Sequence, residues 1–316
     1  MTQHPGVAYT LTLVGLAMAA FIVGGCADDA ANQSTAGAFY AGTGPDGVRV
    51  VVRSSPRRIV AANACAAEFL LALVPSERIA GVPDTVFDGF AIGFDDPDQW
   101  PNRVFHRYRG IEILALRPDL VITHGHQDGA TTRALRNAGK PVVQLSAITG
   151  FEDLIDTIEL VARICDAEER GRELVSDLNR RHGILSKNTT RRRLRVVSYA
   201  NFAGGWTQGG KSTADLLIEM AGMINASAEG KAGENHYPID IERLTQLDPD
   251  LFLVGVDPGG GSPGRDFLRN ESALAGLRAI KHGRIVTLPT ALWTSSSHHL
   301  VTAAEQLAAA VDALKL

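Results

Sequence analysis

Six short apolar runs, rich in Val, Ile and Leu, alternate along the chain with stretches whose apolar residues have helical spacing. Runs of this kind are typical of strands that are buried on both faces of a parallel sheet. The runs cover residues 58–62, 120–123, 141–145, 194–198, 251–254 and 284–288. Buried strands alternating with helices predict an α/β fold with central parallel sheets.

Between the first three runs and the last three, residues 151–187 contain no Pro and only two Gly. Apolar residues from Leu154 onward keep helical spacing, which predicts a long helix or a helix pair. Its central place predicts a spine over residues 149–189. This spine would join an N-lobe, residues 48–148, to a C-lobe, residues 190–316.

Two segments repeat one pattern. Residues 112–122 and 242–253 both read as a helix, then Leu-x-Pro-Asp-Leu, then an apolar run. Pro ends each helix, and the apolar run after it is expected to enter the sheet. The repeat therefore predicts two similar lobes.

The start of the chain has the pattern of an export signal. An apolar and small-residue run from Val7 to Gly25 ends at Cys26. Small residues before a cysteine are typical of a lipobox, in which the thiol is acylated and the preceding peptide is removed. The sequence thus predicts a signal peptide over residues 1–25, a lipid anchor on Cys26 and a flexible tether over residues 26–47. An uncleaved membrane anchor is the alternative.

Composition narrows the choice of partners. A net charge of -4 and 6% aromatic residues offer neither a basic field nor a stacking surface, so nucleic acid is not an expected partner. Cys65 and Cys165 remain beyond the anchor. Two cysteines make no disulfide framework; they are expected as buried free thiols, with a single bridge as the alternative.

The segment from Gly205 to Ser212 matches the G-x4-G-K-S pattern of nucleotide-binding loops. The export signal argues against a nucleotide site, as does a separation of about seven residues between the preceding strand and Gly205. Ser212 and Asp215 instead predict a capping box that opens a helix running to about Gly222. Lys211 and Ser212, at that helix start, are candidates for holding an anionic chelate.

A further set of segments carries a family resemblance. In the N-lobe they are Pro56–Val60, Ala67-Glu68, Arg78–Val82 and Leu116–Ile122, and in the C-lobe Gly210–Ser212, Leu216–Gly222, Pro238–Asp250 and Gly283–Val286. With these segments the chain resembles the helical-backbone (class III) periplasmic binding proteins of iron-siderophore and vitamin B12 ABC transporters. The resemblance implies two Rossmann-like lobes joined by a long spine helix.

The resemblance also implies a function without catalysis or a cofactor. The chain would be an extracytoplasmic, membrane-anchored binding lipoprotein that captures a ferric siderophore or related iron chelate between its lobes and delivers it to an ABC permease. Haem or cobalamin is the alternative ligand. Two alternatives come from other functional classes: a metal-dependent hydrolase that uses His124 and His126, and a scaffold lipoprotein without a ligand. No G-x-S-x-G or H-E-x-x-H motif occurs in support of the hydrolase.

Ligands of parallel α/β sheets bind beyond the carboxyl ends of the strands. The residues selected by this rule are Asn63, His124, His126, Trp206 and Trp293. The resemblance supports His124 and Trp293 and adds Tyr237 and His298 or His299. Aromatic and imidazole side chains suit a flat chelate, but both Trp could equally be core residues. Adjacent helical residues point about 100° apart, so only one of His298 and His299 is expected to face a ligand.

In the resembled family, a carboxylate on each lobe pairs with arginines of the permease. Glu242 stands at the family spacing from the Pro-Asp pair. Glu112 stands one residue too close, and Ile111 occupies the expected place. Docking through Glu242 is therefore predicted, and docking through Glu112 is left open.

Overall fold

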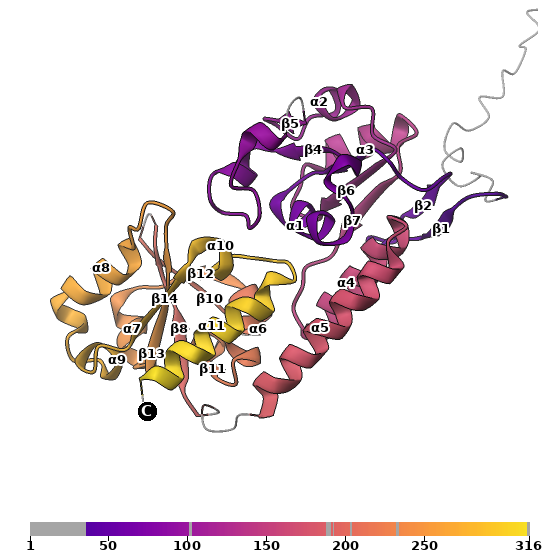
Figure 1. The fold of residues 1–316 in the computed structure, drawn as a ribbon. Helices are drawn as coiled ribbons and strands as arrows, with labels where there is room; N and C mark the ends of the chain where they lie inside the picture. The colour runs from indigo at the N-terminus through magenta and orange to yellow at the C-terminus, as the bar shows by residue number, and fades with distance from the viewer. Residues whose placement is uncertain are drawn as a thin grey trace, which may run out of the picture. The chain divides into compact units, whose positions relative to one another are not determined.

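The computed structural model describes residues 36–100, 103–187, 191, 193–202, 204–231 and 234–314 (Figure 1). The predicted signal peptide, Cys26 and most of the predicted tether lie outside these residues. Within the described part, no helix combines the length and the apolar character needed to cross a membrane.

The N-lobe is built on a five-stranded parallel sheet with the order β5-β4-β3-β6-β7. Its strands are β3 (Ile59–Ala61), β4 (Ile79–Pro83), β5 (Val104–Phe105), β6 (Leu120–His124) and β7 (Val142–Leu145). Its helices are α1 (Ala64–Leu73), α2 (Gly110–Ala115) and α3 (Gly129–Asn137), with 3₁₀ turns at Ser76–Arg78, Asp84–Phe87 and Pro97–Gln99. The three strands predicted in this half are confirmed.

The C-lobe repeats this arrangement with a parallel sheet of order β11-β8-β13-β14. Its strands are β8 (Arg195–Ser198), β11 (Ile224–Asn225), β13 (Leu251–Val256) and β14 (Ile285–Pro289). Its helices are α6 (Thr213–Met220), α7 (Ile241–Leu247), α8 (Pro263–Asn270), α9 (Arg278–Lys281), α10 (Thr290–Trp293) and α11 (His299–Ala313), with 3₁₀ turns at Ala226–Ala228 and Ser272–Leu274. The order matches β4-β3-β6-β7 of the N-lobe strand for strand, so the predicted similarity of the lobes is confirmed.

The C-lobe also carries a small antiparallel sheet of order β12-β10-β9. It is formed by β9 (Ala200–Asn201), β10 (Gly205–Gln208) and β12 (His236–Pro238). The first half of the nucleotide-loop motif is thus a strand. A Cβ on Gly205 would lie 2.3 Å from the Ile239 carbonyl oxygen, and one on Gly209 would lie 2.2 Å from that of Glu234. These glycines permit close packing of backbones and do not form a phosphate loop.

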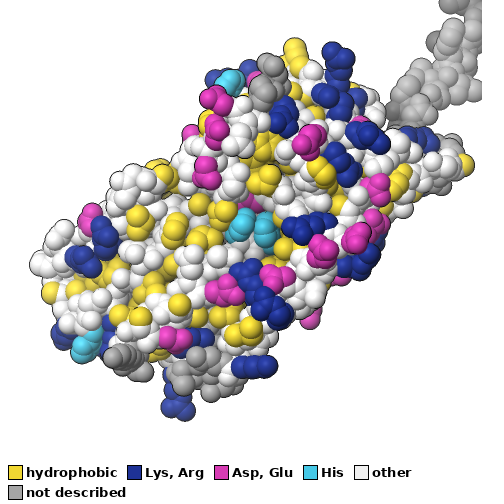
Figure 2. Space-filling model, viewed as in Figure 1, with side chains coloured by type: hydrophobic (Ala, Val, Ile, Leu, Met, Phe, Trp, Pro, Cys, Tyr) yellow, Lys and Arg dark blue, Asp and Glu magenta, His cyan; other side chains and the backbone are white. Residues whose placement is uncertain are grey.

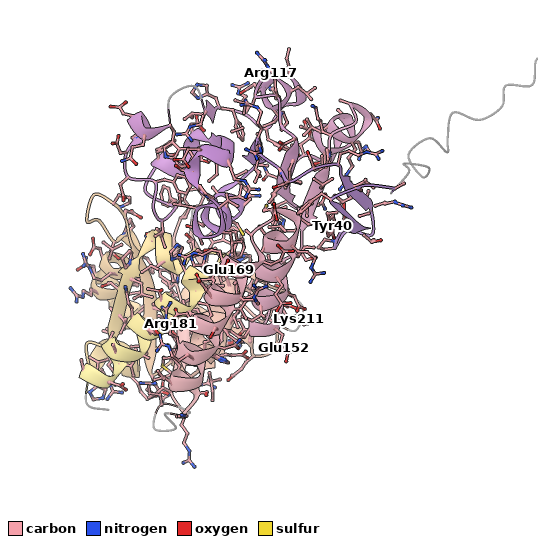
Figure 3. All side chains as sticks on the ribbon, turned by 45° about the vertical axis from the view of Figure 1, so that its right-hand side comes forward. Tyr40, Arg117, Glu152, Glu169, Arg181 and Lys211 are labelled. Carbon is pink, nitrogen blue, oxygen red and sulfur yellow. The ribbon has the colours of Figure 1, made fainter. Side chains whose placement is uncertain are left out.

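The helical segment between the lobes, predicted as a long helix or a helix pair, is a pair, α4 (Phe151–Ile164) and α5 (Glu168–Lys187) (Figure 1). The chain turns at Asp166, whose φ of 55° is left-handed and ends the first helix. Gly171 lets α5 approach α4, because a Cβ there would lie 2.5 Å from Cβ of Ala162. The 20-residue α5 contacts α1 of the N-lobe and α11 of the C-lobe. Its Arg181, marked in Figure 3, forms a 2.6 Å ion pair with Glu305.

An antiparallel hairpin, β1 (Tyr40–Thr43) and β2 (Arg49–Val52), precedes the N-lobe sheet. The sequence predicts a flexible tether over residues 26–47, but residues 40–47 form the first strand and the turn of this hairpin. Contacts distant in sequence order them instead: Asp46 pairs with Arg136 of α3 at 2.6 Å, and the hairpin partner Val50 is buried.

Within the described part of the chain, Cys65 and Cys165 are both free, as predicted. Burial raises the pKa of both thiols, that of Cys165 to about 12. Both side chains are therefore neutral thiols.

Candidate ligand-binding site

A cavity of about 300 Å³ is lined by side chains from both lobes. Its lining residues are Asn63, Ala64, Cys65, His124, His126, Gln127, Ala147, Ile148, Lys211, Ser212, Thr213, Asn235, His236 and Ser296. The N-lobe members follow β3, β6 and β7, at the carboxyl ends of parallel strands. That is where ligands of open α/β sheets bind.

Two imidazoles stand at the end of β6. The His124 and His126 rings are stacked, with centroids 4.6 Å apart and an angle of 19° between their planes. The backbone N–H of His126 donates to Nδ1 of His124 at 3.4 Å. Burial, and secondarily His126, lowers the pKa of His124. His124 is therefore neutral near pH 7 and offers lone pairs instead of positive charge.

The start of α1 contributes Asn63 and Cys65. Asn63 is the N-cap, and its Oδ1 accepts from the backbone N–H of Ala66 at 2.9 Å. Its Nδ2 is buried and has no hydrogen-bond partner among the described residues, so a donor remains unused at this edge of the cavity. The Cys65 thiol donates to the Ser296 carbonyl oxygen at 3.0 Å and joins the two lobes beside the cavity.

The C-lobe side is formed by the turn that leads into α6. Ser212 caps this helix by accepting from the backbone N–H of Asp215 at 3.1 Å, as the capping-box prediction required. Its hydroxyl also donates to the Gly209 carbonyl oxygen at 2.6 Å. Lys211 adopts a left-handed φ of 59° and is exposed. Among the described lining residues, Lys211 supplies the only permanent positive side-chain charge.

His236 and Asn235 line the cavity although the sequence interpretation did not select them. His236 begins β12, where exposed and buried side chains alternate, and its neighbour Tyr237 points the other way. Tyr237 is 3% exposed, and its hydroxyl donates to the Ser227 carbonyl oxygen at 2.6 Å. The two-residue period of this strand is the signal that could have identified His236. Burial lowers the pKa of His236, so this imidazole is also neutral.

Five predicted residues thus line the cavity: Asn63, His124, His126, Lys211 and Ser212. The other five do not: Trp206, Tyr237, Trp293, His298 and His299. Trp293 is buried in the hydrophobic core that α11 helps to form. Trp206 is exposed on β10, next to the inward-facing Thr207.

His298 and His299 lie at the start of α11, with ring centroids 4.0 Å apart. His298 also approaches the ring of Phe69 at 6.0 Å, so it packs against α1 of the N-lobe. Burial lowers the pKa of His298 to about 3 and that of His299 to about 4. Both imidazoles are therefore neutral, and His298 takes part in the contact between the lobes.

The described residues contain no group of three or more His, Cys, Asp or Glu side chains placed to hold a metal ion. His124 and His126 thus lack a third protein ligand in the described part of the chain, which the hydrolase alternative would need.

The two candidate docking carboxylates differ in their surroundings. Oε2 of Glu112 accepts the backbone N–H groups of His106 and Arg107, each at 3.1 Å. Glu242 is exposed, and among the described residues the one hydrogen bond to its carboxylate comes from Nε2 of Gln246 at 3.3 Å. The Glu112 carboxylate is thus hydrogen-bonded to the backbone of its own lobe, whereas the Glu242 carboxylate is accessible to a binding partner.

The sequence profile of the periplasmic binding protein family matches residues 112–292. No curated protein sequence gives a significant match. Among solved structures, a protein of an Fe3+-hydroxamate transport system from Saccharomonospora viridis has a TM-score of 0.68 at 21% identity, covering 86% of this chain and 98% of its own. The heme-binding protein RhuT from Roseiflexus scores 0.69 at 23% identity, covering 82% of this chain and 99% of its own. The molybdate-binding protein MolA from Haemophilus influenzae scores 0.72 at 18% identity, covering 87% of this chain and 91% of its own.

At these identities the structural likeness concerns the fold, and the family follows from the profile. Members of the family are extracytoplasmic, non-enzymatic components that bind small molecules and deliver them to ABC permeases. Because the profile spans more than half of the chain, this protein belongs to the periplasmic binding protein family.

Proposed function

We propose that this chain is the substrate-binding lipoprotein of an ABC importer and that it captures a ferric siderophore in the cavity between its lobes. The observation that carries the proposal is the cavity itself, because residues from both lobes line it. A ligand held there contacts both lobes at once. The apolar run that ends at Cys26 supports an exported chain held at the membrane by lipid.

The charge of the cavity favours one class of siderophore. Lys211 is the only permanently charged side chain among the described lining residues, and the imidazoles of His124 and His236 are neutral. A ferric tris-catecholate carries several negative charges that one lysine would leave uncompensated. A ferric tris-hydroxamate is neutral and needs hydrogen-bond partners, which Asn63 and Gln127 provide.

Haem or cobalamin is the second candidate. Three imidazoles, those of His124, His126 and His236, line the same cavity from both lobes. Neutral imidazole is a good axial ligand for iron and cobalt. A chelate whose metal keeps an open axial position would use these side chains, whereas a fully coordinated ferric siderophore would only accept hydrogen bonds from them.

Delivery to the permease requires a surface that the transporter can recognise. Glu242 is our candidate on the C-lobe, because its carboxylate is exposed and only weakly engaged within the lobe. An exposed carboxylate gives orientation and speeds association with a cationic partner.

The test is calorimetric titration of the full chain, in detergent, with a ferric hydroxamate, a ferric catecholate, hemin, cyanocobalamin and molybdate. We expect sub-micromolar binding of the ferric hydroxamate. Lys211→Ala and His124→Ala should each weaken it by about tenfold, equivalent to about 1.4 kcal/mol. His282→Ala is the matched control, because His282 is exposed on the C-lobe surface and lies outside the cavity.

Binding of hemin or cyanocobalamin with loss in His124→Ala would replace the siderophore by the second candidate. If none of the five compounds binds, or if His282→Ala is as damaging as His124→Ala, the proposed capture site is wrong.

A further inference from the structure

The first two turns of α1 lie against the C-lobe beside the cavity. Ala64 and Cys65, in the first turn, line the cavity. Glu68, three residues beyond Cys65 and four beyond Ala64, lies on the same face of the helix. The Glu68 side chain is buried, with 3% of its surface exposed. Because Glu is almost never fully buried unless it is paired, its partners show what this position does.

Glu68 joins three segments of the chain. Its Oε1 accepts from the backbone N–H of Ile92 at 2.8 Å, and its Oε2 accepts from the Ser295 hydroxyl at 3.2 Å. The segment that contains Ile92 itself reaches the C-lobe, because a Cβ on Gly89 would lie 2.3 Å from Cγ of Pro258. The Glu68 carboxyl group therefore lies where two segments of the N-lobe meet a turn of the C-lobe.

The C-lobe turn at residues 295–297, between α10 and α11, has two buried serines on either side of one that lines the cavity. The hydroxyl oxygens of the buried Ser295 and Ser297 lie 3.0 Å apart. The backbone N–H of Ser297 donates to Oγ of Ser295 at 3.2 Å, and that of His299 donates to Oγ of Ser297 at 3.3 Å. Ser296 lines the cavity, and its carbonyl oxygen accepts from the Cys65 thiol. The bonds of the buried serines therefore also set the position of Ser296.

Within the described residues, no cation pairs with Glu68. Figure 2 shows His side chains where the two lobes meet. His298 and His299, which follow the turn, are neutral because burial lowers their pKa to about 3 and about 4. Arg181 of α5 acts on both imidazoles, but its guanidinium pairs with Glu305. The carboxyl group is therefore held by hydrogen bonds and not by an opposite charge.

Opening of the contact between the lobes would change the solvation of Glu68. Burial raises the pKa of Glu68, and the hydrogen bonds that it accepts oppose only part of this rise. Cys65, on the same face of α1, has its pKa raised mainly by burial and secondarily by Glu68, so it stays a neutral thiol. Water that reached Glu68 from the C-lobe side would bring its pKa back toward the ordinary value. The neutral carboxyl group thus favours the contact, and the ionised carboxylate favours its opening.

We propose that Glu68 is a positioning residue of the ligand cavity: it holds the turn at residues 295–297 against α1, and ionisation of its carboxyl group loosens this contact between the lobes. The inference rests on the proposed capture of a ferric hydroxamate. A ligand that touches both lobes binds more tightly when the cavity keeps the arrangement that it contacts. Affinity is then greatest below the ordinary carboxyl pKa and falls as the pH rises through the raised pKa of Glu68.

The first measurement follows the contact itself, without ligand. Iodoacetamide labelling of Cys65 in the full chain, in detergent, is read by peptide mass spectrometry between about pH 5 and pH 8 for the wild type and Glu68→Gln. Gln keeps an acceptor for the Ile92 N–H but cannot ionise. We expect the ratio of the wild-type rate to the Glu68→Gln rate to rise severalfold with pH. A direct effect of the carboxylate charge would lower this ratio, because Glu68 disfavours the Cys65 thiolate.

The second measurement is calorimetric titration with the ferric hydroxamate at the same pH values. The wild-type affinity should fall severalfold as the pH rises, beyond any change in Glu68→Gln. Titration of the cavity imidazoles is common to the two proteins and cancels in this comparison. Glu169→Gln is the matched control, because Glu169 is exposed on α5, and it should keep the wild-type profile in both measurements (Figure 3). Ser297→Ala removes a hydroxyl from the turn and should speed the labelling of Cys65 at low pH as well.

The outcomes separate this inference from the proposed function. If the labelling ratio does not change with pH, or if Ser297→Ala leaves the labelling unchanged, Glu68 does not control the contact and the inference is overturned. If the wild type and Glu68→Gln bind the hydroxamate with the same pH dependence, the positioning role is wrong while the proposed function stands. If the hydroxamate does not bind at any pH although the labelling ratio rises, the proposed ligand is wrong and the ionisable contact between the lobes stands.

Discussion

Asp119 in the N-lobe and Asp250 in the C-lobe follow the proline after equivalent helices, and each binds the backbone at the start of a neighbouring strand. Asp119 accepts the N–H groups of Arg57 and Arg58 at 2.7 and 2.9 Å. Asp250 accepts that of Arg195 at 2.9 Å. Arg58 and Arg195 in turn donate from their side chains to carbonyl oxygens at the ends of α2 and α7. The repeated Pro-Asp therefore has a folding role that both lobes need.

The first turns of α2 and α7 differ between the lobes, and so do the interiors of α1 and α6, the helices that precede them. Glu68 of α1 and Leu217 of α6 each lie five residues after the N-cap, and both are buried. The Glu68 carboxylate accepts from the Ile92 backbone at 2.8 Å and from the Ser295 hydroxyl at 3.2 Å, so it links the N-lobe to the C-lobe. Leu217 packs only in an apolar core. The comparison separates positions that fold a lobe from positions that give each lobe its own contacts.

The largest expected loss of stability concerns the three-stranded antiparallel sheet of the C-lobe, which has no equivalent among the described residues of the N-lobe. In Gly205→Ala the new Cβ meets the backbone oxygen of Ile239, which cannot move without distorting the strand pair. In Gly81→Ala of the N-lobe the one contact of the new Cβ shorter than 3.0 Å is with the end of the Leu116 side chain, at 2.4 Å. We expect urea unfolding to show a loss of about 3 kcal/mol for Gly205→Ala and about 1 kcal/mol for Gly81→Ala. Equal losses would contradict this difference.

The next largest loss of stability is expected at Asp119 and Asp250, which bind the backbone of a neighbouring strand in their own lobes. Asp119→Ala removes the acceptor of two backbone N–H groups and should lower the free energy of unfolding by about 2 kcal/mol. Asp250→Ala removes one such bond and a 2.7 Å pair with Arg278, and should cost about as much. Asp98→Ala is the control, since no bond to its carboxylate is found in the described residues. A loss confined to one lobe would mean that the repeated Pro-Asp has different roles.

The buried carboxylate of α1 should make the stability depend on pH. Burial raises the pKa of Glu68 in the folded protein, so this carboxyl group ionises at a lower pH in the unfolded chain than in the folded one. Stability is then greatest below the ordinary carboxyl pKa and falls as the pH rises from that value through the raised folded pKa. Glu68→Gln lacks this titration, so its stability relative to the wild type should rise by about 1 kcal/mol between pH 4 and pH 8. Urea unfolding at several pH values measures it, and a constant difference would show that Glu68 does not titrate in this range.

The buried strands, the repeat and the capping box could be predicted from the sequence because they depend on local patterns and period. The small antiparallel sheet could not, because its glycines are required by contacts such as that between Gly205 and Ile239, which are distant in sequence. The cavity was predicted best where a residue directly follows a parallel strand, as His124 does. It was missed at His236, where the decisive property was which side of an antiparallel strand faces the cavity.

The smallest expected effect concerns the N-caps of the equivalent helices α2 and α7, which differ between the lobes. Oδ1 of Asp240 accepts from the Arg243 backbone N–H at 2.7 Å and caps α7, whereas no described side chain caps α2, whose N-cap is Arg109. Arg109→Asp should supply the missing cap and raise the free energy of unfolding by about 0.5 kcal/mol. Arg109→Ala removes the same positive charge without adding a cap and should not stabilise the fold. Urea unfolding of both variants measures the difference, and equal stabilities would show that α2 gains nothing from a capping side chain.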